Sequence, residues 1–436
     1  MSVAGRLPAL LREPVFRRYW TGQTVSLFGD QITQVALPLL AVLALDAGPA
    51  QMGRLTAAGL LPSLLFSVHA GVRADRSGRR RHMMIAADLG RALALVSIPA
   101  AWALGWLGLG QLYAVAFSVG TLSVLFDVCN AALFVSLLPA DRYVEGNSLI
   151  NGSRAMSYVG GTSAAGALVQ LLSAPVALLA DTASYLTSAW QLARIRPTEP
   201  PAAAHARGDL TAGFRYLARS PVLRGYYAAV TTLNLFNFAF QAVFVLYATT
   251  ELGLGPGLLG AVLGCGAVGS LLGALMTGRI ARRLGTGRAA LLGLFAFPAP
   301  LVLVPLARGP VAVTATCLLL AEFGSGFGVM LLDIAGGSLT ASLIPDSLRS
   351  RAAGAARLFN YGIRPVGALA GGWLASATGL RPTLWIATLG ALLGLVWALP
   401  SGLLRRARPA PEAENVHVPP LKQKNRGPAL RRGTRG

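Results

Sequence analysis

The sequence is poor in charge. Of its 436 residues, 13% are Asp, Glu, Lys or Arg, whereas 54% are hydrophobic. Soluble domains carry about 25% charged residues, so this composition excludes an ordinary soluble domain and indicates a polytopic membrane protein. The chain is long enough for roughly a dozen helices of about 20 residues with short loops between them.

Cysteine and histidine are also scarce. The three cysteines, Cys129, Cys265 and Cys317, all lie inside apolar runs, and the four histidines form no H-x-x-H pattern. This spacing predicts no metal site, and the sequence offers no nucleophile–base constellation of the kind an enzyme requires. We therefore expect no enzyme activity and no bound cofactor, with the proton gradient as the energy source.

Acidic residues are outnumbered by basic ones. The chain has 17 Asp and Glu against 38 Lys and Arg, which gives a formal net charge of +21. Most of the arginines gather in segments that fall on one side of the predicted helices. Because basic residues favour the cytoplasmic side of a membrane, the pattern predicts two cytoplasmic termini and no nucleic-acid partner. The composition, rich in Ala, Gly and Arg, suits the inner membrane of a bacterium.

Apolar runs follow one another as six plus six. Each is expected to be a helix, because lipid offers the backbone no other hydrogen-bond partner. The runs are 20–45, 52–70, 83–107, 112–138, 146–172, 175–193, 223–250, 257–278, 289–307, 311–340, 353–377 and 381–404. The predicted parts are a cytoplasmic N-terminus at 1–19, a six-helix bundle at 20–193, a cytoplasmic linker at 194–222, a second six-helix bundle at 223–404 and a cytoplasmic tail at 405–436.

The linker and the tail are the polar parts of the chain. Residues 210–219 place Leu210, Phe214 and Leu217 on one helical face and arginines on another, which predicts an interfacial helix on the inner leaflet. The tail is basic and rich in proline and glycine, and it is expected to be disordered. Contact with anionic membrane lipid is the alternative for the tail.

A short charged stretch interrupts the first bundle. Gly71–Arg81 reads G-V-R-A-D-R-S-G-R-R-R, and Gly71 and Gly78 predict tight turns of a loop. A weaker copy begins 207 residues later, with Asp75 replaced by an arginine. A second repeat relates Asp127, which begins D-V-C-N-A-A-L-F-V-S-L-L-P, to a similar stretch 206 residues later. Two repeats at nearly one offset indicate two halves related by duplication in parallel topology.

Polar residues inside the apolar runs mark a candidate site, because a charge at the centre of a membrane costs about 2.5–3.5 kcal/mol. The polar positions are Asp30 and Gln34 in the first run and, 207 residues later, Asn237 and Gln241 in the seventh. We expect Asp30 to face an aqueous cavity and to couple protons or bind substrate. A structural contact between helices is the alternative. Asp88 and Arg91, one turn apart, predict a local ion pair.

Two further intramembrane charges are candidates for the substrate cavity. Arg154 lies well inside the fifth run and requires a carboxylate, for which Asp30, Asp181 or an anionic substrate are the candidates. Glu322 lies in the tenth run, on the same helical face as Asp333. A structural ion pair is the alternative for both Arg154 and Glu322.

The charged stretch carries a resemblance to a known family. It resembles the G-x-x-x-D-R-x-G-R-R signature between the second and third helices of the major facilitator superfamily. Further stretches look most like its drug:proton antiporter branch, which includes macrolide efflux proteins and enterobactin exporters; these stretches are 16–31, 85–91 and 360–372. The resemblance implies an all-α membrane fold of twelve transmembrane helices, arranged as two pseudo-symmetric six-helix bundles.

The resemblance also implies a gate. In the family, the acid of the signature braces the inner gate while the outer side is open. For this sequence, the resemblance implies that Asp75 meets the inner end of the eleventh helix and that Arg79 and Asp127 complete a charge cluster. The signature positions Gly71, Arg76 and Gly78 belong to the same gate. The fifth helix departs from the antiporter pattern, because Gly160 and Gly161 are followed by threonine rather than proline.

The expected function is secondary active transport across the inner membrane by alternating access. We expect proton-coupled efflux of a small organic molecule such as a drug, antibiotic or siderophore, by a protein that works as a monomer. An importer or facilitator on the same fold is the first alternative. A transport-inactive sensor or scaffold, whose activity lies in its basic tail, is the second.

Overall fold

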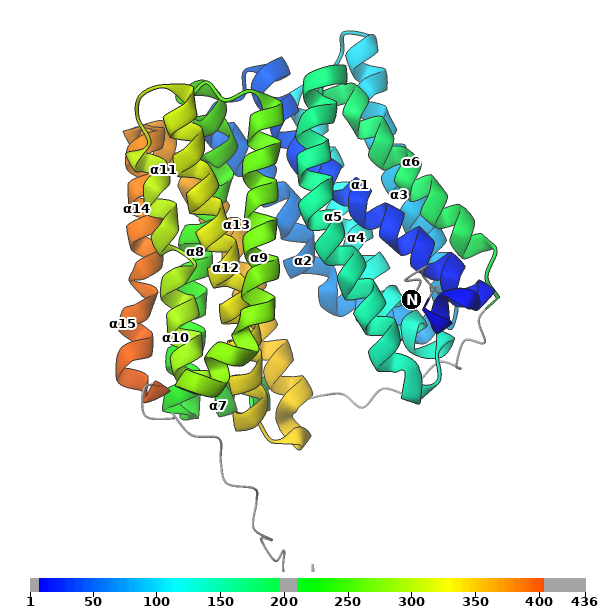
Figure 1. The fold of residues 1–436 in the computed structure, drawn as a ribbon. Coiled ribbons are helices and arrows are strands. Elements are labelled where there is room, and N and C mark those ends of the chain that lie inside the picture. The colour runs from blue at the N-terminus through cyan, green and yellow to red at the C-terminus, as the bar shows by residue number, and fades with distance from the viewer. Residues whose placement is uncertain (1–7, 197–209, 404–436) are drawn as a thin grey trace, which may run out of the picture.

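A computed structural model describes residues 8–196 and 210–403, and these residues form helices and no strand (Figure 1). The first half contains α1 (Pro14–Leu45), α2 (Pro49–Ser77), α3 (Arg80–Ala103), α4 (Leu109–Leu137), α5 (Tyr143–Leu172) and α6 (Ala174–Ala193). The second half contains α7 (Leu210–Arg219), α8 (Pro221–Thr250), α9 (Pro256–Leu284), α10 (Thr286–Ala296), α11 (Leu303–Leu306), α12 (Val311–Leu343), α13 (Asp346–Thr378), α14 (Leu380–Leu392) and α15 (Gly394–Ala398). Single 3-10 turns occupy Ala9–Arg12, Ala140–Arg142, Ala299–Val302 and Leu399–Ser401.

Together these helices make two bundles of six spans, as the sequence predicts. In the second bundle, α10 and α11 form one span, Thr286–Leu306, and α14 and α15 form another, Leu380–Ser401. Eight spans in the described residues are long and apolar enough to cross a membrane. The remaining four are α2, α5, α6 and α13. Three of these, α2, α5 and α13, face the other half, because α2 packs on α13 and α5 packs on α9.

Glycines allow helices of the two halves to approach each other closely. A Cβ atom built on Gly53 of α2 would lie 2.7 Å from the carbonyl oxygen of Ala368 and 2.9 Å from the Cα atom of Gly372, both on α13. A Cβ built on Gly166 of α5 would lie 2.7 Å from the Cα of Gly260 on α9. Main chain therefore lies against main chain, as small residues at helix interfaces allow.

These glycine contacts lie at one end of the molecule. They involve the first turns of α2 and α9 and the last turns of α5 and α13. We call this end the far side. The opposite end, which carries the start of α1, the α2–α3 turn and α7, we call the arginine-rich side (Figure 1).

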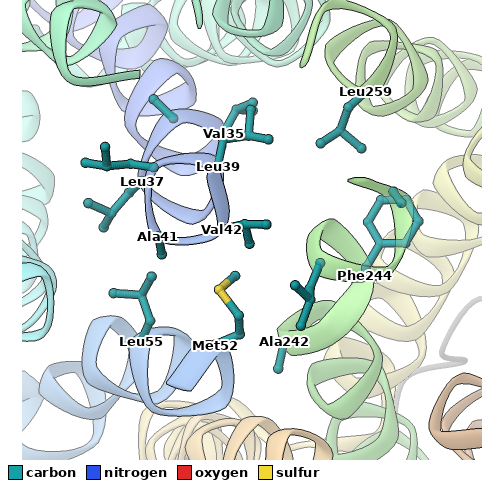
Figure 2. Close-up of a cluster of buried hydrophobic side chains, with 14 of the residues drawn as sticks. Val35, Leu37, Leu39, Ala41, Val42, Met52, Leu55, Ala242, Phe244 and Leu259 are labelled. Atoms are coloured by element: carbon teal, nitrogen blue, oxygen red, sulfur yellow. The ribbon is translucent and has the colours of Figure 1, made fainter. Parts of the chain in front are cut away.

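The apolar cores follow the same division. The largest buried cluster contains residues of both halves, among them Val42, Met52, Phe244 and Leu259 (Figure 2). Near the arginine-rich side the buried clusters are separate, one around Phe16 and Met84 in the first half and others in the second half. The halves thus share a core on the far side and have their own cores on the arginine-rich side.

The charged stretch at 71–81 is mostly helix, so the predicted loop is wrong in its extent. Helix α2 continues to Ser77, Gly78 adopts the left-handed conformation (φ 57°), and α3 begins at Arg80. Gly71 lies inside α2 and makes no turn. The alanines and arginines are good helix formers, so the helix ends only at a glycine that accepts positive φ. The side chains of Asp75 and Arg76 lie outside the described residues.

Helix α7 forms at the predicted residues, but part of its apolar face packs on protein. The ring of Phe214 meets that of Phe359 on α13, with centroids 5.1 Å apart, and Leu217 is buried. Tyr216 donates a hydrogen bond of 2.7 Å to the carbonyl oxygen of Leu343 at the end of α12. These contacts attach α7 to the second half.

We predict opposite effects for one chemical change at two glycines of α9. A Cβ on Gly269 would overlap the backbone of Phe323 on α12, whereas the nearest atom to a Cβ on Gly278 is a guanidinium nitrogen of Arg282 at 3.5 Å. Gly269→Ala should lower the thermal unfolding temperature of the detergent-purified protein. Gly278→Ala should leave it unchanged or raise it, since alanine stabilises a helix by about 0.5–1 kcal/mol relative to glycine. Equal changes in the unfolding temperatures of the two variants would refute the close α9–α12 contact.

Candidate functional site

A buried ion pair lies at the centre of the first half. Asp88 is 0% exposed and Arg91 is 3% exposed, and the Arg91 guanidinium donates a hydrogen bond to the Asp88 carboxylate. Arg91 also donates to the hydroxyl of Ser123 at 3.4 Å. Both charged residues lie on α3, one turn apart, so the predicted local pair is confirmed. Their burial makes this pair costly to break, because either partner alone would be an unpaired charge.

Asp30 connects this pair to the accessible interior. Its Oδ1 lies 3.9 Å from a guanidinium nitrogen of Arg91 and accepts a hydrogen bond of 2.6 Å from the hydroxyl of Tyr185. The Asp30 side chain is 31% exposed, against 3% for Arg91. Asp30 therefore belongs both to a buried network and to a surface that solvent reaches. Its partner is Arg91 and not Arg154.

Aromatic rings enclose the same guanidinium. The Cζ atom of Arg91 lies 4.4 Å from the ring centroid of Phe126 on α4 and 4.2 Å from that of Tyr185 on α6. Cation–π contacts of this kind stabilise a desolvated cation by about 2 kcal/mol. The two rings also fix the plane in which Arg91 meets its carboxylates.

A third carboxylate, Asp181, completes the cluster. It is fully buried on α6, and it accepts hydrogen bonds from Thr33 and, at 2.8 Å, from Ser184. A Cβ built on Gly29, the residue before Asp30, would overlap the Asp181 carboxylate, so Asp181 packs directly against this turn of α1. We call Asp30, Asp88, Asp181 and Arg91 the acid cluster. When all four are ionised, three negative charges surround one positive charge, so a bound proton would relieve the repulsion.

Arg154 forms no ion pair with Asp30 or Asp181 in the described part of the chain. It is exposed on α5, and Asp127 on α4 lies within electrostatic range of it, as Asp127 also does of Asp30 and Arg91. The second half repeats this arrangement, because Arg364 on α13 attracts Asp333 on α12. Each half thus places an acid of its fourth helix opposite an arginine of its fifth.

The polar positions of α8, which we call the polar stripe, are Asn234, Asn237 and Gln241, and one of their polar atoms has no partner within the described ranges. Asn237 has a buried carbonyl oxygen without a partner among the described residues. One turn away, Asn234 donates a hydrogen bond of 3.0 Å to Asn360 on α13. Gln241, like Gln34 at the equivalent place in α1, is exposed. Both glutamines are therefore free to contact a substrate from opposite halves.

Glu322 is an isolated acid in the second half. It lies in the middle of α12 against α9, where a Cβ on Gly266 would be 3.1 Å from its carboxylate oxygen. Within residues 8–196 and 210–403, no hydrogen bond or ion pair to this carboxylate is found. Glu322 therefore has no structural ion-pair role in the described part of the chain.

The predicted gate residues lie at two different depths along the helices. Gly78 and Arg79 form the turn between α2 and α3. Asp127 lies ten residues before the end of α4 at Leu137, which is about 15 Å along a helix. Asp127 thus lies deeper in the first half than the α2–α3 turn. The charges within electrostatic range of it are those of Asp30, Arg91 and Arg154.

Sequence reasoning missed that the local pair on α3 is the centre of the site. It also missed Tyr185, Ser184 and Thr33, since their role depends on how α1, α3 and α6 pack. One signal was present: Asp181 and Tyr185 are four residues apart, so a helix places them on one face.

Comparison with known proteins agrees with this architecture. The sequence model of the Major Facilitator Superfamily matches residues 19–363 and 229–433. No protein of curated function matches the chain.

Among solved structures, a bacterial homologue of the iron transporter ferroportin, in an inward-facing state, has a TM-score of 0.71 at 19% identity, covering 90% of this chain and 99% of its own. The nucleoside transporter NupG has a TM-score of 0.69 at 12% identity, covering 90% and 100%. A bacterial homologue of the human lysosomal transporter Spinster, inward-facing and occupied, has a TM-score of 0.69 at 11% identity, covering 93% and 100%. At these identities the likeness shows a shared fold, whereas the family model spans most of the sequence. The chain belongs to the Major Facilitator Superfamily, and it is a multi-pass membrane transporter rather than an enzyme.

Proposed function

We propose that this transporter exports a small organic molecule from a bacterium across the inner membrane in exchange for protons. The observation that carries the proposal is Asp30, which is partly exposed and yet joined to the buried Arg91 and Tyr185. An acid in this position can exchange a proton with the cavity while its charge is balanced from the buried side. Its protonation would change the charge of the acid cluster, which is the change that coupling requires.

The charges of the interior favour a substrate that carries positive charge. The acids of the two halves are Asp30, Asp88, Asp127, Asp181, Glu322 and Asp333, and the arginines among them are Arg91, Arg154 and Arg364. Acids therefore outnumber arginines, and Glu322 has no described partner. A cationic drug or antibiotic and a proton would compete for the same negative charge. Gln34, Asn237 and Gln241 supply the hydrogen bonds that orient such a molecule.

Alternating access follows from the distribution of contacts between the halves. The far side is closed by glycine contacts and a shared core, and the cores near the arginine-rich side are separate. With the arginine-rich side in the cytoplasm, this arrangement is the inward-facing state. Two of the three similar structures named above are in an inward-facing state. In the opposite state, Asp75 and Arg79 would brace the closed arginine-rich side.

The test is transport into everted membrane vesicles under a pH gradient, with a panel of cationic and neutral dyes and antibiotics. Wild-type protein should accumulate a cationic compound, and Asp30→Asn should abolish gradient-driven accumulation. Asp30→Asn removes the charge and preserves the shape, so binding without a gradient should remain measurable. Gln34→Ala is the matched control on the same helix, since it alters substrate contacts and leaves proton coupling intact.

Other outcomes distinguish the alternatives. Gradient-driven uptake of equal rate in wild type and Asp30→Asn would remove Asp30 from the mechanism. Uptake by whole cells rather than by everted vesicles would indicate an importer or facilitator. Iron and nucleosides belong in the panel, because two of the similar structures are a homologue of an iron transporter and a nucleoside transporter. No transport of any compound would favour the sensor or scaffold.

A further inference from the structure

A cavity lies outside the polar site. It has a volume of about 470 Å³ and is bounded by α7, the first turns of α8, α13 and α15. Phe214 on α7 and Phe359 on α13 line one part of it, and Tyr227 on α8 and Trp397 on α15 line another. It shares no lining residue with the acid cluster or with the polar stripe of α8. The proposed transport cycle gives it no role.

The walls of this cavity are suited to an acyl chain. Trp397 is 55% exposed and Phe359 is 54% exposed, although both lie on membrane-spanning segments. Exposed tryptophan near the end of such a segment is typical of the membrane interface. Exposed apolar side chains continue along the chain on either side of Trp397, among them Leu393, Val396 and Leu399. Lipid, rather than water, is the medium that covers such a surface.

The mouth of the cavity carries uncompensated positive charge. Arg224 lines it, is exposed, and forms no ion pair with any residue in the described ranges. It lies in the first turn of α8, which begins at Pro221, so the positive end of the helix dipole adds to its charge. A helix start ordinarily favours an acid, and here it holds an arginine. This combination favours an anionic group at the mouth.

The positive charge of Arg224 also decides between two possible occupants of the cavity, the chain's own C-terminal segment and a phospholipid. The chain after residue 403 begins close to Trp397 and could reach the cavity, but it is basic from its first residues, L-L-R-R-A-R at 403–408. A basic segment would be repelled by Arg224. A phospholipid with an anionic headgroup matches both the charge at the mouth and the apolar walls.

We propose that this cavity binds an anionic phospholipid of the leaflet on the arginine-rich side. Its phosphate contacts Arg224, and an acyl chain lies along Tyr227, Thr231 and Trp397. Because α7 forms part of the wall, the bound lipid also fastens α7 to α8 and α15.

The experiment measures lipid contact at Trp397 in the full-length protein, reconstituted with brominated phospholipids that quench tryptophan fluorescence. The quenching of Trp397 is obtained as the difference between wild type and Trp397→Phe. Brominated phosphatidylglycerol should quench Trp397 more strongly than brominated phosphatidylcholine. Arg224→Gln should lower this preference about fivefold, the effect of one basic side chain near an anionic surface.

Two further variants make the test specific. Arg215→Gln removes the same charge from α7 at a position that does not line the cavity, so it should keep the preference. Ala228→Phe fills the cavity and should reduce quenching by both lipids. Equal quenching by the two lipids in wild type would overturn the proposal, because lipid contact would then not depend on headgroup charge. Absence of quenching by both lipids would also overturn it and indicate another occupant, such as the chain's own tail. Equal losses in Arg224→Gln and Arg215→Gln would also overturn it, because the effect would then be general surface charge.

Discussion

Replacing Arg91 by glutamine is expected to destabilise the protein more than any other single charge change in the first half. The guanidinium is buried between Phe126 and Tyr185 and balances Asp88 and Asp30. Removing one partner of a buried ion pair costs about 3–5 kcal/mol, because the other charge stays buried. The apparent unfolding temperature in detergent should fall by roughly 10 °C, measured by intrinsic fluorescence.

Two comparisons separate this effect from a general loss of charge. Arg154→Gln removes the same charge from an exposed position that has no contact ion pair with any described residue, so it should change stability by about 0–1 kcal/mol. Adding Asp88→Asn to Arg91→Gln should restore part of the lost stability, because the stranded carboxylate is then gone. If Arg91→Gln and Arg154→Gln shift the unfolding temperature equally, the acid cluster is not a structural centre.

A disulfide between the halves is expected to stop transport completely. A Cβ built on Gly264 of α9 lies 3.4 Å from the Cβ of Ser163 on α5, close to the separation of about 3.5–4.5 Å in disulfides. Ser163→Cys with Gly264→Cys should cross-link on mild oxidation and hold the far side closed. The neighbouring Cys265 is replaced by serine so that it cannot compete. Transport into everted vesicles should fall to background and return when the disulfide is reduced.

A cross-link inside one half is the matched control. A Cβ on Gly22 of α1 lies 3.3 Å from the Cβ of Gln191 on α6, and both helices belong to the first half. Gly22→Cys with Gln191→Cys should therefore form a disulfide without stopping transport. Unchanged transport in the oxidised Ser163→Cys/Gly264→Cys protein would show that this contact does not open during the cycle.

The helices and the duplication could be predicted from the sequence because they depend on local patterns. Apolar runs of sufficient length require helices in lipid, and the repeats at offsets of 206 and 207 residues relate the two halves directly in the sequence. The turn at Gly78 was predicted correctly because glycine accepts positive φ. The extent of the loop was not, since charge along 71–77 suggested a break where helix propensity carries α2 onward.

The partners of the buried charges could not be predicted, because they depend on rotation and depth of several helices together. Arg154 and Asp30 both lie in apolar runs, and spacing alone made them plausible partners. The packing of α1 against α6 and of α3 against α6 instead brings Asp30 to Arg91. Arg91 looked like half of a local pair, and only the packing shows that Tyr185 and Asp30 reach the same guanidinium.

The glycine seam on the far side has a consequence for how solution conditions affect the transporter. The seam joins main chain to main chain at Gly53–Gly372 and Gly166–Gly260, and a hydrogen bond of 2.8 Å from the Gly257 amide to Gln170 joins the halves beside it. Contacts between uncharged groups are not screened by dissolved ions, whereas contacts between exposed charges weaken over a Debye length of about 8 Å at physiological ionic strength. Added salt should therefore leave the closed far side as strong as before and weaken any closure made by charges on the arginine-rich side. High ionic strength would then hold the protein in the state described here.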